Sequence, residues 1–480
     1  MNRVLVLVLV LVACGGGDGV GHLTDAPLPV DAALSPDGAI DGAMIDGAMP
    51  DSPVGGGDRP VTLTVTSAGA PVAGAHVYFL NTDNSVMMMA ATSAEGTASA
   101  VMAAGGSVTI LDPFPGQRAV AVGSNELVTF LGIKPGDHLA VTRSARDSVA
   151  VVVTATHAID ATRYDVVTTC GSGSIASPRG EPASDPSGTV NLEGCHGAAD
   201  IAVVARSVDP KTGVSTPILG LLHADALLTD NGPVNLTGDS YAPLADVTFT
   251  YTHAPGTPLE IDHAPLLGHG PLGPFTVNIT GETETIHEPM VSAASSAVTM
   301  SVDVDSGTHK VMDWGPSSAT YTLDLAGVLL PEMPGPPAFD FATGAVTWTE
   351  AAQGAVPDAT VLVLEIARSA PARDWTWLVI APHAPGQLAL PRLPTDIADW
   401  IPVAGDSAFI DHVSSLKLTG GYDALRARTI DFGGNDLTLI SGPAGRLVSM
   451  ISMSSSGIAA PASRNRDRRR ARRSLFGPSR

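Results

Sequence analysis

The side chains most able to bind a metal gather in one stretch of the sequence. His253, Asp262, His263, His269 and His287 fall within 35 residues, between segments predicted as strands and among several prolines. Imidazole nitrogens and carboxylate oxygens held on loops can converge on zinc or another divalent ion. Their spacings, however, match no established metal site, and histidines scattered over surface loops would give the same pattern. We therefore expect no metal and no cofactor.

Two short motifs resemble those of catalytic serines. Gly238-Asp239-Ser240-Tyr241 is similar to the Gly-Asp-Ser-Leu block of one esterase family, but the chain lacks the late Asp-x-x-His that supplies the base in that family. Ser414-x-x-Lys417 matches an acylating Ser-Lys pair, which requires a helix. Val413–Leu418 alternates like a strand, so these two side chains would face opposite sides of a sheet. Neither His-Glu-x-x-His nor Gly-x-Ser-x-Gly occurs. We expect no catalytic residue and no enzyme activity.

The tryptophans suggest a place for ligand binding. Four of the five lie in the last third of the chain, and Trp375 and Trp377 are two residues apart in a predicted strand, on one face of it. A pair of indoles can stack on sugar rings, which makes Trp375 and Trp377 a candidate ligand platform. The alternative is that both pack between two sheets, as a buried tryptophan does in immunoglobulin-like sandwiches.

The amino-terminal residues point to a lipid anchor. Met1-Asn2-Arg3 carries one charge and is followed by the apolar run Val4–Val12 and then by Ala13-Cys14. The run is too short to span a bilayer. This pattern resembles the signal peptide and lipobox of bacterial lipoproteins. The resemblance implies cleavage before Cys14 and acylation of that cysteine, with more than one acyl chain giving a stable anchor. An ordinary secretory signal cut near Cys14 is the alternative.

With Cys14 assigned to lipid, Cys170 and Cys195 remain. An even pair in an exported chain predicts one disulfide, and closing a loop of this length would stabilise the fold by about 3–4 kcal/mol in the chain-entropy model. The alternative is a metal-binding or nucleophilic thiol, because His196 adjoins Cys195. A metal site would need further ligands at short spacing, so we favour the disulfide.

Composition identifies the elements that must position these residues. The chain is 44% hydrophobic but only 15% charged and 4% aromatic, and Val, Ala, Thr, Gly and Pro dominate. This mixture favours many short strands and turns, as in Val61–Thr66, where apolar and hydroxyl side chains alternate. The net charge of −22 argues against nucleic acid as a partner. We predict an all-β chain of tandem antiparallel β-sandwich domains.

One of these domains resembles known modules. Residues 60–145 are similar to carboxypeptidase regulatory-like and bacterial immunoglobulin-like sandwiches, which the families use as non-catalytic modules. The resemblance rests on Gly69-x-Pro71-Val72-x-Gly74-Ala75-x-Val77, Thr92-x-x-x-Gly96 and Gly105-Gly106-Ser107-Val108-Thr109.

The whole chain divides into eight predicted segments. These are the signal peptide 1–13; lipidated Cys14 and a disordered Asp/Gly/Pro-rich acidic tether, 14–59; the sandwich 60–145; a sandwich with the disulfide, 146–250; a β-rich domain, 251–330; a Pro-rich linker, 331–337; a last β domain, 338–455; and a disordered Arg-rich tail, 456–480.

These observations together predict where the protein works. Gly15, not Asp, follows Cys14, so the inner-membrane retention rule of the lipoprotein class is not met. We expect a cell-envelope lipoprotein of the outer membrane or cell surface, held to the membrane through Cys14. Its expected role is non-catalytic, as a structural or adhesive module that binds an envelope polysaccharide or protein. The alternative is a glycan-binding or hydrolytic accessory protein that uses the tryptophan-containing last domain.

Overall fold

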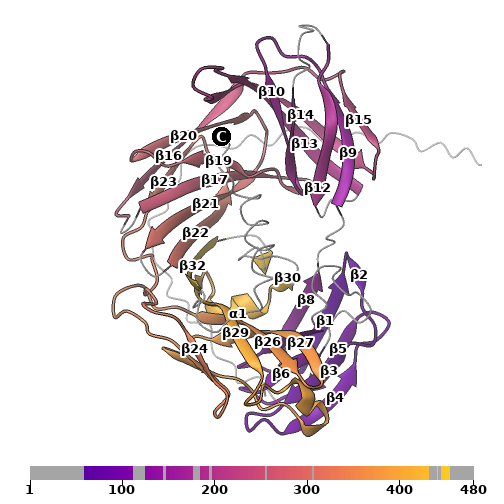
Figure 1. The fold of residues 1–480 in the computed structure, drawn as a ribbon, viewed down its shortest axis with the longest axis vertical. Coiled ribbons are helices and arrows are strands. Elements are labelled where there is room, and N and C mark those ends of the chain that lie inside the picture. Colours follow the sequence, from indigo (N-terminus) through magenta and orange to yellow (C-terminus); the bar gives the residue numbers. More distant parts are fainter. Residues whose placement is uncertain are drawn as a thin grey trace, which may run out of the picture. The chain divides into compact units, whose positions relative to one another are not determined.

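The computed structural model describes residues 59–111, 125–143, 148–176, 184–193, 197–254, 257–304, 307–431, 440–441 and 445–453. The predicted signal peptide, Cys14, the acidic tether, Cys195 and the Arg-rich tail lie outside these residues. The described part is all-β, as predicted: it consists of strands in several sheets, with two short helices, η1 (Thr395–Trp400) and α1 (Gly421–Arg426) (Figure 1). Neither helix has the length and apolar character needed to cross a membrane.

The first sandwich begins with a strand that follows the alternation in its sequence. In β1 (Pro60–Ser67), Val61, Leu63 and Val65 are buried while the threonines between them are partly exposed. Its sheet runs β2-β1-β8-β30-β31, with β5 also paired to β1. The other strands of this sheet are β2 (Ala70–Pro71), β5 (Thr97–Val101), β8 (His138–Arg143), β30 (Thr429–Asp431) and β31 (Ile440–Ser441).

The facing sheet of this sandwich combines strands from both ends of the chain. β7 lies parallel to β27, with Leu127 opposite Trp377, and so joins β3 and β6 to β26 and β29. The core between the two sheets includes Val61 and Val141 together with Ile380 and Leu416. The predicted domains 60–145 and 338–455 therefore share one sheet and one core. The strands are β3 (His76–Leu80), β4 (Val86–Ala91), β6 (Ser107–Leu111), β7 (Asn125–Phe130), β26 (Ala359–Ser369), β27 (Ala372–Pro382) and β29 (Ser407–Leu418).

A second core covers the opposite face of these central strands. β7 buries Val128 and Phe130 in the first core and Leu127 in the second. The second core is closed by η1 and by the small sheet of β24 (Ala338–Asp340), β25 (Ala345–Thr347) and β28 (Gln387–Ala389). Met333 is part of it, so the predicted linker 331–337 contributes a buried side chain.

The middle of the chain forms a separate sandwich. One sheet runs β12-β9-β15 and the other β11-β10-β13-β14. They enclose a core rich in valine, with Tyr164 fully buried in it. The strands are β9 (Ser148–Ala155), β10 (Arg163–Thr168), β11 (Ser172–Ala176), β12 (Ser187–Glu193), β13 (Gly197–Val208), β14 (Ser215–Leu228) and β15 (Pro233–Leu236).

The last group of strands connects the rest. The sheet β20-β16-β23 packs on β17, β19, β21 and β22, and the fourth core between them also contains Ala202 and Val204 from β13. β32 then pairs with both β22 and β29, which completes a continuous 13-stranded sheet from β18 to β4. The strands are β16 (Leu244–Thr252), β17 (Thr257–Leu267), β18 (Gly270–Pro271), β19 (Phe275–Asn278), β20 (Thr283–Pro289), β21 (Ser295–Val304), β22 (Gly307–Pro316), β23 (Thr320–Asp324) and β32 (Gly445–Met453).

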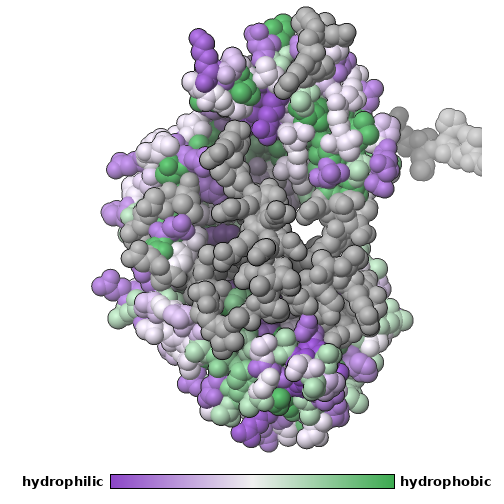
Figure 2. Space-filling model, viewed as in Figure 1, coloured by the Kyte–Doolittle hydropathy of each residue, from purple (hydrophilic) through white to green (hydrophobic). Residues whose placement is uncertain are grey.

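The described surface mixes residue types. On the face shown in Figure 2, hydrophilic and hydrophobic residues are interspersed among the coloured atoms. Of the large apolar side chains that are exposed, Val86, Met88 and Met89 are neighbours on β4. β4 ends the 13-stranded sheet and pairs with β3 on one side.

Replacing Leu127 with Ala tests whether the two ends of the chain share one core. Leu127 is fully buried, and truncating such a leucine costs about 2–5 kcal/mol of unfolding free energy. We expect urea denaturation to show this loss for Leu127→Ala, in a single transition that includes the tryptophan fluorescence of Trp375 and Trp377. Met89→Ala on exposed β4 is the control and should change stability by less than about 0.5 kcal/mol. A variant whose tryptophan transition stays at the wild-type position would contradict a shared core.

Candidate functional site

The structure corrects the hypothesis that Trp375 and Trp377 form a ligand platform. Both side chains are only 1% exposed and lie in the core beneath η1. The Trp377 indole N–H donates to Thr129 Oγ1 at 3.0 Å, and Trp375 meets Trp400 edge to face at 6.3 Å. Because β27 is covered on both faces, the same-face spacing places these indoles in the interior. The alternative of core packing is the one observed.

The surroundings of Trp375 are held by a partly buried ion pair. Arg368 forms two 2.8 Å hydrogen bonds to the Asp406 carboxylate and donates to the carbonyl oxygens of Asp399 and Ile401. Its guanidinium also lies 5.3 Å from the Trp375 ring centroid. Burial opposes ionisation of Asp406, but the hydrogen bonds and charge of Arg368 hold the pKa of this carboxyl below its usual range. This arginine anchors η1 to the large sheet.

The histidine-rich stretch separates into independent pairs. His253 bonds Asp324 at 2.9 Å, and His287 bonds Asp246 at 2.7 Å; both pairs are exposed. The stretch therefore does not converge on one centre among the described residues, since the carboxylates belong to different strands. Asp262 instead accepts a hydrogen bond from the Thr276 hydroxyl.

His263 belongs to a buried network rather than to a surface loop. Its Nδ1 lies 2.7 Å from the Glu288 carboxylate, and both side chains are about 95% buried. Tyr321 stacks on Phe249 at 5.2 Å, and its hydroxyl lies 3.4 Å from His263 Nε2 and 2.5 Å from Ser296 Oγ. These contacts join β17, β20, β21 and β23. The network satisfies polar groups within a sandwich, with His263 and Glu288 buried and Tyr321 partly exposed.

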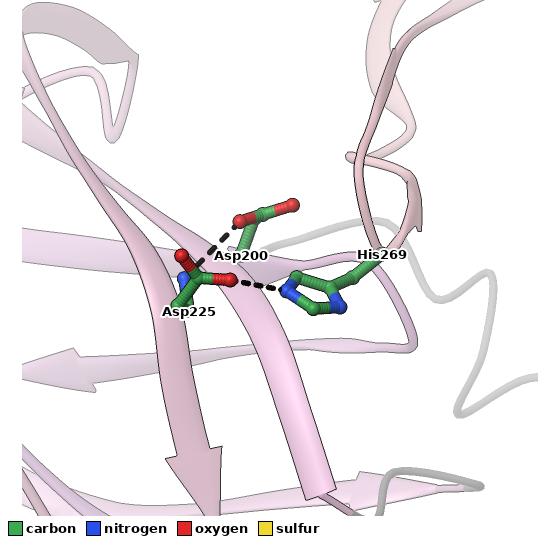
Figure 3. Close-up of side chains that lie close together, drawn as sticks. All are labelled: Asp200, Asp225 and His269. Carbon is green, nitrogen blue, oxygen red and sulfur yellow. Dashed lines mark hydrogen bonds and ion pairs between the residues drawn. The ribbon is translucent and has the colours of Figure 1, made fainter. Parts of the chain in front are cut away.

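Asp200, Asp225 and His269 form a cluster that the sequence analysis missed. Each offers a ligand atom, and the three atoms lie within 4.8 Å of one another. Asp225 Oδ1 is 2.5 Å from His269 Nε2, and Asp200 Oδ1 accepts the Asp225 backbone N–H at 3.3 Å (Figure 3). Among the described residues, this is the group whose geometry could hold a metal ion.

A β-bulge positions the two carboxylates of this cluster. The register between β13 and β14 shifts between Ala199 and Ile201, so Asp200 stands opposite more than one residue of β14. Asp225, with φ of 57°, adopts the left-handed conformation that aspartate tolerates. His269 lies in the tight turn between β17 and β18, two paired strands of the 13-stranded sheet.

The electrostatics of the cluster favour a positive charge. The hydrogen bond to Asp225 raises the pKa of His269; burial opposes the shift, and the charges of Asp200 and Asp225 add to it. Asp200 is 3% exposed, whereas the other two side chains reach solvent. The signal in the sequence was Asp200 itself, a lone acid at the edge of the apolar run Ile201–Ala205.

The two serine motifs and the two cysteines lie on separate parts of the chain. Ser240 is on an exposed turn, with Asp239 beside it bonded to His223 at 2.8 Å. Val413–Leu418 lies in β29 as predicted, with Ser414 buried and Lys417 donating to the Val356 carbonyl oxygen. Cys170 follows β10 and packs against the valine-rich core of the sandwich formed by β9 to β15. Cys195 lies outside the described residues. The disulfide between them stays a prediction.

Comparison with known proteins finds no matching family model and no matching curated protein. Among solved structures, the chain is similar to the Bacillus anthracis TIE protein (9% identity, 56% of this chain and 50% of that chain, TM-score 0.14). It is also similar to a streptococcal ancillary pilin (9% identity, 58% and 99%, TM-score 0.14) and to the major pilin of Streptococcus pyogenes (5% identity, 50% and 99%, TM-score 0.11). The chain thus spans half the length of the TIE protein. TM-scores this low do not extend the functions of those proteins to this chain.

His309 on β22 makes the stability of the described part depend on pH. Burial lowers its pKa to about 4, so the folded protein holds a neutral imidazole where the unfolded chain, near 6.5, takes up a proton. The contribution is complete above pH 6.5 and is lost as the pH falls toward 4. We expect wild-type stability to drop by about 2–3 kcal/mol more than that of His309→Leu between pH 7 and 4.5.

Urea denaturation of both proteins across this pH range measures the difference. His138→Leu, at an exposed histidine on β8, is the control and should follow the wild-type profile. Parallel profiles for wild type and His309→Leu would show that His309 is not the titrating group.

Proposed function

We propose that this chain is a non-catalytic lipoprotein of the cell envelope, in the outer membrane or on the cell surface. The proposal begins with the sequence of residues 1–14, where a charged start, a nine-residue apolar run and Ala13-Cys14 resemble a lipoprotein signal. Two or more acyl chains on Cys14 would anchor the protein stably. The acidic segment that follows would separate the folded part from the membrane surface.

The observation that carries a structural or adhesive role is the continuity of the backbone pairing. The 13-stranded sheet passes through three of the four cores, and β7, β27 and β32 bind its parts together by ladders of several consecutive residue pairs. Separating these parts requires breaking whole ladders and exposing core side chains at once. A protein that must hold a ligand while anchored to a membrane needs this resistance to local opening.

Two arginines support the same proposal because each of them joins separate elements of the fold or secures a helix to a neighbouring loop. Arg143 pairs with Glu126 across two strands of facing sheets. Arg426, 2% exposed, binds the Gly132 carbonyl oxygen and the Asp423 carboxylate. These groups are used to stabilise the fold. Loops at the ends of the sandwiches remain to recognise a ligand, for which we propose an envelope polysaccharide or protein.

Replacing Cys14 with Ala tests the anchor. The full chain, expressed in a bacterium that processes lipoproteins, should fractionate with membranes and have the intact mass of a chain that starts at acylated Cys14. Cys14→Ala should be released or remain unprocessed, because it has no thiol to carry the diacylglyceryl group. Cys170→Ala is the matched control and should stay with the membrane. An unacylated, soluble wild-type protein would overturn the proposal.

The proposed Cys170–Cys195 disulfide makes a separate prediction. Intact mass without reductant should be lower than the reduced mass by two hydrogen atoms. Cys170→Ser and Cys195→Ser should each lower the unfolding free energy by about 2–4 kcal/mol. The double variant should lose no more than either single one, since all three lack the same bond. Alkylation of both thiols in the untreated, folded protein would contradict the pairing.

A further inference from the structure

We propose that Asp200, Asp225 and His269 bind one divalent transition-metal cation, of the type of Zn²⁺. The three residues come from β13, β14 and the turn before β18, so their meeting is a product of the tertiary fold. The site is independent of the lipid anchor and of the ligand of the proposed adhesive surface.

A buried oxygen without a partner points to a missing cation. Asp200 is 97% buried, and its Oδ2 receives no hydrogen bond from the part of the chain that the structure describes. Figure 3 shows this second oxygen on the side of the carboxylate away from the Asp225 N–H. An unpaired buried carboxylate is costly, and such groups are paired or coordinate metals in folded proteins. His269 and Asp225 are hydrogen-bonded to each other and not to Asp200 Oδ2, so this oxygen is available as a metal ligand.

The spacing of the ligand atoms suits a small cation. Ligands of tetrahedral zinc sit about 2.0–2.2 Å from the metal and so about 3.3 Å from one another. His269 Nε2 and Asp225 Oδ1, at 2.5 Å, are joined by a hydrogen bond. Binding a metal would require loss of the proton between these two atoms. The atoms would also have to move apart by less than about 1 Å, which is the difference between the two distances. Both side chains reach solvent, so they can move and a water can fill the fourth position.

The donor set favours zinc over calcium or magnesium. Ca²⁺ takes six to eight oxygen ligands, and Mg²⁺ an octahedron of oxygens. This cluster supplies two carboxylates and one imidazole nitrogen, which suit a transition metal with three protein ligands. Two negative charges in a protein of net charge −22 also attract a cation.

A bound metal would link two parts of the fold. Asp200 and Asp225 belong to the sandwich of β9 to β15, and His269 follows β17 of the next group of strands. These groups already share Ala202 and Val204 in the fourth core. Coordination would add a cross-link at the edge of that contact, and the resulting stabilisation would grow with metal concentration.

The test measures zinc binding by the full, metal-free chain with its cysteines oxidised. Isothermal titration calorimetry with zinc chloride, and native mass spectrometry, should show one tightly bound Zn²⁺ and a higher melting temperature. Asp225→Asn and His269→Ala should each weaken this binding by about tenfold or more and abolish the shift in melting temperature. Both positions are exposed, so the variants should fold like the wild type. Asp200→Asn should weaken binding in the same way.

His287→Ala is the matched control. His287 bonds an aspartate in a comparable exposed pair, at 2.7 Å, and is not among the three residues of the cluster. The zinc affinity of the His287→Ala protein should stay within about twofold of the wild-type value. Absence of saturable zinc binding, unchanged binding in the three cluster variants, or an equal loss in His287→Ala would each overturn the proposal. A preference for calcium over zinc would also overturn it.

Discussion

The parallel pairing of β7 with β27 is the constraint on which the described architecture depends. It brings residues 125–130 beside residues 375–380, and together with the parallel pairing of β8 with β30 it places strands of the amino-terminal part and of the carboxyl-terminal part in the same sheets. A strand in the middle of a sheet has both edges paired, and here both faces are buried as well. Leu127 and Phe130 therefore serve two different cores from one strand. The two sandwich layers around the central sheet follow from this arrangement.

Covering both faces of the central strands determines what their polar and aromatic side chains can do. Trp375 and Trp377 share a face, as their spacing requires, but that face meets η1 and the β24–β25–β28 sheet. A buried indole needs a hydrogen-bond acceptor, and Thr129 supplies one for Trp377. A charge removed from solvent needs a counter-ion, and Asp406 is the counter-ion of Arg368. The Trp377 indole and the Arg368 guanidinium thus find partners within this region, whereas the buried indole N–H of Trp375 has no hydrogen-bond partner among the described residues.

The irregular pairing between β13 and β14 leaves a polar group without a partner, in contrast to the Arg368–Asp406 pair. The bulge at Asp200 interrupts the ladder and leaves a buried carboxylate oxygen without a protein partner in the described part of the chain. Bulges re-aim side chains and occur next to functional sites. His269, from a turn 44 residues beyond Asp225, brings an imidazole to the same place. The cluster that we propose as a metal site therefore lies where regular pairing fails.

The sequence by itself determined the local structure. Alternating apolar and hydroxyl residues, as in Val61–Thr66, specify half-buried strands because side chains in a strand point to opposite faces in turn. The all-β class and the strand at Val413–Leu418 follow from this pattern. Only the tertiary structure decided which strands meet and which faces are covered. The alternation is the same whether a face packs on a sheet or meets solvent, so it could not distinguish a tryptophan platform from a tryptophan core. Nor could spacing reveal Asp200, Asp225 and His269, since long-range strand packing, not local periodicity, brings them together.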